Sequence, residues 1–249
     1  MSSNPSGGLR WHWRAWRWRP RWSATCQHIE DWLMAQTEMP SDTLVLIGAS
    51  AGWMMPPRWL ARFACIHTWD IDPWAAPLFR RRHGAALRAQ GIALHTHTAD
   101  ALGQLPALVA QHPHALFWFD NLLGQLCLFE PGRPAVVEQR LRGLRQTLAP
   151  VAWGSLHDRL SGPVDERSLV IPPTRTVPAG NAVEAPEQQA WLHSINAQSP
   201  WGDHLTTEVF PAGTPLAQIA WPFKPGHWHW LEMGWLPAQA RAARNRPKA

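Results

Sequence analysis

One stretch in the first third of the chain constrains the fold more than any other. An apolar run at residues 43–48 passes into a turn of small residues, Gly-Ala-Ser-Ala-Gly, at residues 48–52. Pro56 marks a short helix, because proline is favoured in the first turn of a helix. A second apolar run, residues 64–70, ends on Asp70, 22 positions after the first glycine of the turn. This order of elements predicts a parallel α/β sheet.

The same alternation continues along the chain. We expect a helix that starts at Asp72 and closes near Gly91. Further strands are predicted at residues 92–97, 115–119 and 150–156, and helices at residues 23–38, 101–111, 134–148 and 186–196. Two later runs, 216–223 and 227–235, are joined by Lys-Pro-Gly, which is a turn signal. The last strands should therefore form an antiparallel hairpin.

Charge divides the chain into a body and two basic ends. We expect a basic Trp/Arg-rich arm at residues 1–22, a domain at residues 23–237 and a basic tail at residues 238–249, with an irregular excursion at residues 160–210. Nine of the 23 lysines and arginines lie in the two ends, so the body holds 14 basic and 18 acidic residues. An acidic body is a poor surface for binding phosphates.

Composition excludes several classes of protein. The chain has no apolar run of 18 residues, and its basic N-terminus lacks the apolar core of a secretory signal, so we expect no membrane span and no export. Three widely spaced cysteines, Cys26, Cys65 and Cys127, favour a reducing, cytoplasmic setting and argue against a thiolate zinc site. His95 and His97 share one face of a strand, but no cysteine or carboxylate partner is evident, so no metal site is expected.

In this order, the elements resemble the class I S-adenosylmethionine-dependent methyltransferase fold. That fold is Rossmann-like, with a seven-stranded, mostly parallel sheet and an antiparallel C-terminal hairpin. The resemblance implies S-adenosyl-L-methionine as cofactor and assigns cofactor-binding and transfer-site positions: Gly48, Ala49, Ser50 and Gly52 around its methionine part, Asp70 at the ribose, Asp100 at the adenine amino group, and Asp120 and Asn121 beside the methyl-transfer site. The chain departs from the family pattern at Leu46, where an acid is usual, and at Ser50, where a glycine is usual.

Each candidate also has a purely structural interpretation. Asp70 could be a surface carboxylate, although Asp72 is better placed before Pro73 to cap the next helix. Asp100 could cap the helix at residues 101–111, and Asp120 with Asn121 could simply form a turn. His157 and Asp158 follow a strand beside the expected cleft, where His157 could act as a base or both could only brace a loop.

These residues support several functional hypotheses. The first is methyl transfer to an unidentified acceptor, with a small molecule or protein favoured over nucleic acid. The second is a non-catalytic interaction module, which the changes at Leu46 and Ser50 keep open. The third is a nucleic-acid methyltransferase that uses the arm, through residues 10–22. A short-chain dehydrogenase, whose glycine turn is similar, is disfavoured because Met54 replaces a further glycine and the chain has no tyrosine.

Overall fold

The computed structural model of the chain describes residues 8–37, 39–168, 171–180 and 185–239. Within these residues nine strands form one sheet, in the order β3-β2-β1-β4-β5-β9-β8-β6, with the short β7 paired to β5. The strands are β1 (Thr43–Ile47), β2 (Cys65–Asp70), β3 (Ala93–Thr98), β4 (Leu116–Asp120), β5 (Ala152–Pro163), β6 (Arg175–Pro178), β7 (Gly202–Asp203), β8 (Pro215–Lys224) and β9 (His227–Leu236).

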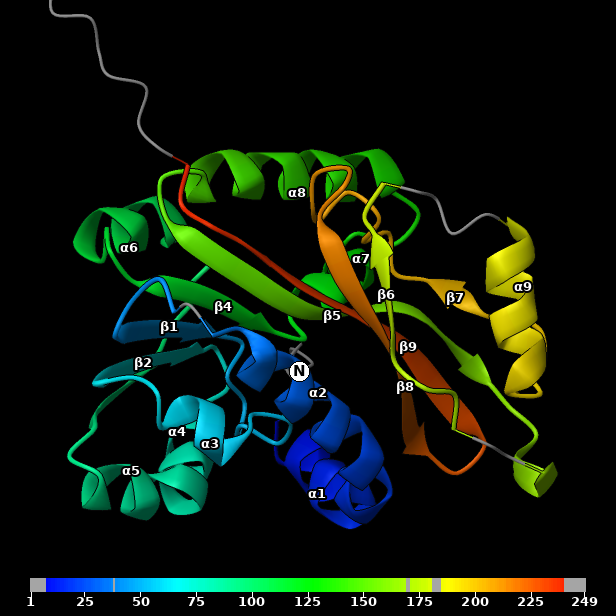
Figure 1. The fold of residues 1–249 in the computed structure, drawn as a ribbon, viewed down its shortest axis with the longest axis horizontal. Coiled ribbons are helices and arrows are strands. Elements are labelled where there is room, and N and C mark those ends of the chain that lie inside the picture. Colours follow the sequence, from blue (N-terminus) through cyan, green and yellow to red (C-terminus); the bar gives the residue numbers. More distant parts are fainter. Residues whose placement is uncertain (1–7, 38, 169–170, 181–184, 240–249) are drawn as a thin grey trace, which may run out of the picture.

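The direction of the strands confirms the predicted fold class. Strands β1 to β5 run parallel, whereas β9 is antiparallel to β5 on one side and to β8 on the other. The path β3-β2-β1-β4-β5-β9-β8 is therefore a mostly parallel, seven-stranded sheet whose last strand is inserted antiparallel. Strand β6 is added at the outer edge beside β8, and β7 pairs with the second half of β5 (Figure 1).

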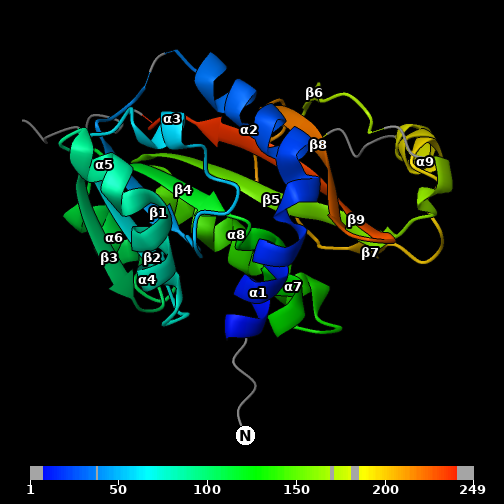
Figure 2. The same ribbon diagram turned by 90° about the horizontal axis from the view of Figure 1, so that it is seen from below.

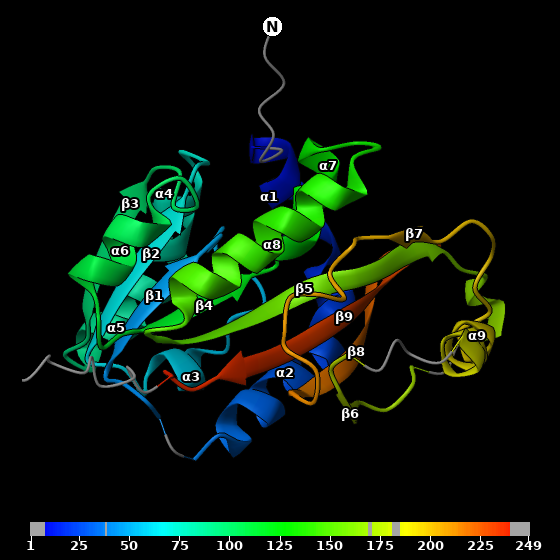
Figure 3. The same ribbon diagram turned by 90° about the horizontal axis from the view of Figure 1, so that it is seen from above.

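Helices cover both faces of the sheet. They are α1 (Gly8–Trp18), α2 (Ser23–Ala35), α3 (Pro57–Leu60), α4 (Ala75–Phe79), α5 (Ala85–Ala89), α6 (Leu105–Gln111), α7 (Leu126–Phe129), α8 (Pro134–Leu148) and α9 (Ala185–Ser194). Helices α1 to α5 lie on one face (Figure 2), and α6, α7 and α8 lie on the other (Figure 3). Helix α9 packs beside the outer strands. No helix in the described ranges is long and apolar enough to cross a membrane.

The alternation of side chains along β1 explains why a core forms on each face of the sheet. Leu44 and Leu46 join the cluster beneath α1 to α5, while Val45 and Ile47 join the cluster beneath α6 and α8. Strand β4, with the sequence LFWFD, is buried at every position, as expected for a central strand covered on both faces.

Some element boundaries differ from the prediction. Helix α6 begins at Leu105 rather than at residue 101, because turns occupy residues 101–104. The helix after Asp72 contains a π-helical turn, Arg80–Gly84. Strand β5 continues to Pro163 because its second half pairs with β9, so the predicted excursion at residues 160–210 starts inside a strand.

The basic arm is packed onto the domain where the structure describes it. Residues 8–18 form α1 and Arg19–Trp22 form a 3₁₀ turn, so Pro20 ends the α-helix as expected from its missing N–H. The Trp22 ring is fully buried and lies edge-on to Trp221 of β8, with ring centroids 5.1 Å apart. Residues 1–7 and 240–249, which include the basic tail beyond residue 239, lie outside the described residues.

Candidate functional site

A cavity of about 840 Å³ opens at the carboxyl ends of β1, β2 and β4. The strand order reverses at β1, which has β2 on one side and β4 on the other. Ligands of open α/β sheets bind at such a switch point. Six of the predicted site residues line the cavity: Gly48, Ser50, Asp70, Asp100, Asp120 and Asn121. Ala49, Gly52 and His157 do not line it.

The turn after β1 is shaped by residues with left-handed backbones. Gly48, Ser50 and Gly52 have φ values of 72°, 47° and 60°. A Cβ atom at Gly48 would lie 2.9 Å from the Cβ of Leu122, so only glycine fits there. The left-handed backbone of Ser50 costs free energy, and hydrogen bonds of its amide and its hydroxyl offset that cost. Of this turn, Gly48 and Ser50 line the cavity.

Asp70 ties this turn to the end of β2. Its Oδ2 accepts a hydrogen bond from the Ser50 amide and its Oδ1 accepts one from the Asp72 amide, each at 2.8 Å. Burial raises the pKa of Asp70, and these two N–H donors act against that rise. Asp72 Oδ1 accepts a hydrogen bond from the Trp74 amide, as expected for a helix cap. Each Asp70 oxygen still has a lone pair for a ligand.

Asp100 stabilises a turn and lies at the cavity. Its Oδ1 accepts hydrogen bonds from the amides of Leu102 at 3.0 Å and Gly103 at 3.2 Å. Because α6 starts at Leu105, with Gln104 as its N-cap, Asp100 does not cap that helix. Its carboxylate is part of the cavity wall.

Asp120 is the most perturbed acid in the cavity. It ends β4, is only 8% exposed, and makes no side-chain hydrogen bond with any described residue. Burial, and secondarily the negative charge of Asp70, raises the pKa of Asp120 to about 8. A buried, unpartnered carboxyl that is poised near neutral pH is a common mark of a functional site.

Asn121 lines the cavity but directs its amide oxygen away from it. With φ of 51°, it turns the chain after β4, and its Oδ1 accepts a hydrogen bond from the Asp158 amide at 3.0 Å. Its carbonyl accepts a hydrogen bond from Gln125 Nε2 at 2.9 Å. Asn121 therefore joins the ends of β4 and β5, and Gln125 supports that junction.

The structure does not bring His157 to the cavity. Its side chain is fully buried in β5, with Nδ1 3.1 Å from the Ser155 hydroxyl and the ring covered by Phe210. Burial lowers the pKa of His157 to about 3. A base in the cavity would have to be another group, and no histidine is among the described residues that line it.

Helix α1 forms a wall of the cavity that the sequence did not indicate. Trp11 Nε1 donates a hydrogen bond to Ser50 Oγ at 3.0 Å, and the Trp11 ring stacks on Phe223 of β8 at 5.9 Å. One residue on, His12 Nε2 lies 3.2 Å from Asp72 Oδ2, and both side chains are buried. The amphipathic pattern of the arm was the only sequence feature that could have indicated this wall. The docking of the arm could not be predicted, because it depends on residues distant in the sequence.

A second polar cluster lies behind the junction of β4 and β5. His229 Nδ1 is 2.7 Å from Asp158 Oδ1, while His204 bonds the Gly124 carbonyl through Nδ1 at 2.7 Å and the Ser161 hydroxyl through Nε2 at 2.8 Å. Burial acts to raise the pKa of Asp158, but His229, His204 and the hydrogen bond with Asn121 together outweigh burial and hold that pKa below its usual range. We interpret this cluster as a charge-balanced brace.

Comparison with known proteins finds similarity at the level of structure. No protein-family model matches the sequence, and no curated protein matches it. Magnesium protoporphyrin IX methyltransferase from Synechocystis PCC 6803, solved with bound SAM, is 13% identical over 85% of this chain and 78% of its own, with a TM-score of 0.43. Geranyl diphosphate C-methyltransferase from Streptomyces coelicolor is 12% identical over 87% and 79%, with a TM-score of 0.39.

A third similar structure concerns the conversion of a disulfide bond into a thioacetal group during echinomycin biosynthesis. It is 15% identical over 81% of this chain and 78% of its own, with a TM-score of 0.42. Similarity at this level says nothing about which reaction the present chain performs.

Proposed function

We propose that this chain is an S-adenosylmethionine-dependent methyltransferase whose cofactor occupies the cavity beside the Gly48 turn. One observation carries the proposal: the carboxyl groups of Asp70 and Asp120 line the same cavity at the switch point of the sheet. The sheet order, with β9 inserted antiparallel, agrees with the resemblance seen in the sequence.

The residues of the cavity fit such a cofactor. The volume of the cavity, about 840 Å³, lies within the range of small-ligand sites. Gly48 lines the cavity without a side chain, so a ligand can approach its backbone closely. The Asp120 carboxyl has no hydrogen-bond partner in the described chain, so it is available to a ligand.

We assign the adenosine part to the side of the cavity formed by β2 and β3. The lone pairs of Asp70 would accept hydrogen bonds from vicinal ribose hydroxyls. Ile71, an apolar side chain that is 43% exposed, and Leu102 line the cavity next to it and would cover the faces of a purine. Asp100, at the same edge, would accept a hydrogen bond from an exocyclic amino group.

Asp120 is the group we assign to the transfer step. When bound, S-adenosylmethionine supplies an electrophilic methyl group on a positively charged sulfur. An Asp120 carboxylate would favour that charge and could accept a hydrogen bond from the acceptor's O–H or N–H, whose proton it would then hold on Oδ. Its pKa of about 8 suits both states at neutral pH. The remaining contribution is alignment of the reactants.

The acceptor in this proposal is a small molecule. Trp11 and Trp22 from the N-terminal helices and Trp221 from β8 form an aromatic wall on the side of the cavity away from β2. Since α1 covers that side, a compact and partly apolar acceptor fits better than an extended polymer.

Calorimetric titration with S-adenosylhomocysteine tests the proposal. We expect saturable binding at one site, and we expect Asp70→Asn to weaken it by about 1–3 kcal/mol, the usual cost of losing a hydrogen bond to a charged acceptor. Asparagine keeps one oxygen acceptor for the turn, which alanine would not. The control is Asp31→Asn, an exposed carboxylate on α2.

The alternative of a non-catalytic module makes the opposite prediction. Wild-type protein that shows no heat of binding and no rise in melting temperature at millimolar S-adenosylhomocysteine would support the module. Equal affinity in wild-type and Asp70→Asn protein would refute the ribose assignment.

A further inference from the structure

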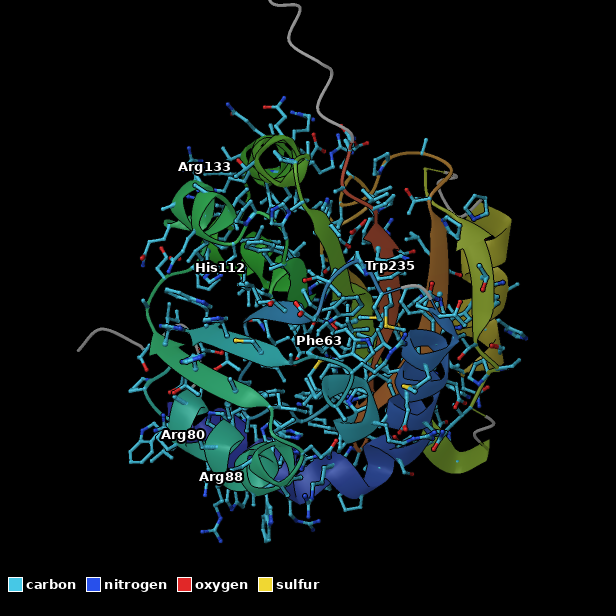
Figure 4. All side chains as sticks on the ribbon, turned by 60° about the vertical axis from the view of Figure 1, so that its left-hand side comes forward. Phe63, Arg80, Arg88, His112, Arg133 and Trp235 are labelled. Carbon is cyan, nitrogen blue, oxygen red and sulfur yellow. The ribbon has the colours of Figure 1, made fainter. Side chains whose placement is uncertain are left out.

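A group of side chains that commonly bind metal ions lies on the α6 face of the sheet. It is on β2 and β3, away from the strand ends that form the cavity. Cys65 and His67 alternate with buried residues on β2, so both point to the same face. His95 lies directly opposite His67 in the parallel register of β3. His112 follows α6 and lies between that helix and the edge of the sheet (Figure 4).

The side chains in this group are close enough to share one ion. Cys65 Sγ is 3.3 Å from His67 Nε2. The potential ligand atoms of Cys65, His67 and His95 all lie within 4.8 Å of one another. The ring of His112 is centred 4.5 Å from that of His67. No cysteine partner for these histidines is evident in the sequence, but in the structure Cys65 supplies one.

One unpaired nitrogen favours a metal ion over a simple packing role. His112 Nε2 is buried and has no hydrogen-bond partner among the described residues. An apolar face would fill this position without leaving such a nitrogen unpaired.

We propose that Cys65, His67 and His95 bind one Zn²⁺ ion through the thiolate and two imidazole nitrogens. His112, whose ring centroid is 4.5 Å from that of His67, is the candidate for the fourth ligand. In tetrahedral zinc sites, Zn–S bonds of about 2.3 Å and Zn–N bonds of about 2.0–2.1 Å place sulfur and nitrogen about 3.5 Å apart. The 3.3 Å between Cys65 Sγ and His67 Nε2 is close to this separation.

A neighbouring histidine completes the arrangement. His67 Nδ1 lies 3.4 Å from His97 Nε2, so a proton on Nδ1 can be donated to His97 while Nε2 keeps its lone pair for the metal. Such outer hydrogen bonds orient metal-binding histidines. Coordination replaces the S–H bond of Cys65 with an S–Zn bond and releases the proton to solvent. The ion would link β2, the edge strand β3 and the end of α6.

Zinc titration of full-length protein without a histidine tag tests this site. In competition with a chromophoric chelator, we expect one Zn²⁺ per chain. Substitution by Co²⁺ should give the charge-transfer absorption of a cobalt–thiolate bond. Cys65→Ser should abolish that absorption, and His95→Gln should weaken binding by at least about 10–100-fold, the loss typical of disturbing even the outer partners of a site. His95 is exposed, so its substitution should leave the fold intact.

Two controls make the result decisive. His114→Gln, an exposed histidine outside the group, should bind zinc as the wild type does. His204→Gln tests the other cluster, in which Asp158, His204 and His229 also lie within ligand distance. The proposal is overturned if the protein binds no stoichiometric zinc, if cobalt–thiolate absorption survives Cys65→Ser, or if His204→Gln abolishes binding while His95→Gln does not. None of these outcomes depends on methyltransferase activity.

Discussion

At the scale of single residues, Asp120 carries most of the proposed chemistry. Its position at the end of β4 could be predicted from the sequence. Its lack of a hydrogen-bond partner among the described residues could not, because hydrogen-bond partners depend on how the neighbouring loops fold. The structure gives Asp120 and its neighbour Asn121 different roles, which the sequence could not do. The Asp120 side chain faces the cavity without a hydrogen-bond partner among the described residues, whereas the Asn121 side chain accepts a hydrogen bond from the backbone of β5.

Asp120 gives a test that distinguishes a cation from a neutral ligand. Since its pKa is about 8 and a sulfonium favours the carboxylate, affinity for S-adenosylmethionine should rise with pH, by up to about tenfold per unit below pH 8. S-adenosylhomocysteine, which lacks the sulfur charge, should show a flatter profile. Calorimetry across this range, with Asp120→Asn as the flat control, measures the difference. Identical profiles for both ligands in the wild type would remove Asp120 from the transfer site.

At the scale of elements, α1 has two different faces. Trp11 points inward and stacks on Trp22 and Phe223, whereas Trp13 and Trp16 are 62% and 57% exposed. The arm thus contributes a cavity wall on one side. Any nucleic-acid contact, which stays an untested hypothesis, would have to use Trp13, Trp16 and the nearby arginines.

The two faces can be compared within one helix. We expect Trp11→Ala to lower the free energy of unfolding by about 2–4 kcal/mol, because it leaves a cavity among packed aromatic rings and removes the hydrogen bond to Ser50. Trp13→Ala, matched in residue type, should change it by less than about 0.5 kcal/mol. Urea denaturation measures both. Similar losses in the two variants would show that α1 is not docked as described.

At the scale of the whole molecule, the sheet could be predicted from the sequence because the patterns that specify its strands and turns are local. The buried run at Leu116–Asp120 and the turn between β8 and β9 specify their elements without distant partners. The docking of α1, the extension of β5 to Pro163 and the placement of His157 could not be predicted. Each depends on contacts with residues far along the chain, such as the pairing of β5 with β9.

The same limit applies to the two sites. The cavity residues come from successive strand ends, which meet at one edge in any parallel sheet, so their meeting could be anticipated. Cys65 and His95 are 30 positions apart, and only the register between β2 and β3 brings their side chains together. Register is set by packing of the whole sheet and is not visible in a short motif.

Two buried groups predict how stability of the whole molecule varies with pH. The pKa of Asp120, about 8, and that of His204, about 9, both exceed the unfolded values of 3.8 and 6.5. At these two groups the folded state binds more protons than the unfolded state between pH 6.5 and 8, so their contribution to stability falls as pH rises. Each group contributes at most about 1.4 kcal/mol per pH unit.

Urea denaturation over this pH range measures the slope. Asp120→Asn should remove part of it and raise the stability of the unliganded protein above neutral pH. An excess of stability of Asp120→Asn over the wild type that does not grow with pH would contradict the protonation state assigned to Asp120.

The most direct test of the central claim is a crystal structure of the chain with S-adenosylhomocysteine. We expect density for the ligand in the cavity beside Gly48, with both ribose hydroxyls within hydrogen-bond distance of the Asp70 carboxylate and the sulfur on the side of Asp120. A ligand bound elsewhere on the molecule, or a cavity without density at saturating ligand while Asp70 contacts only the Ser50 and Asp72 amides, would contradict the account.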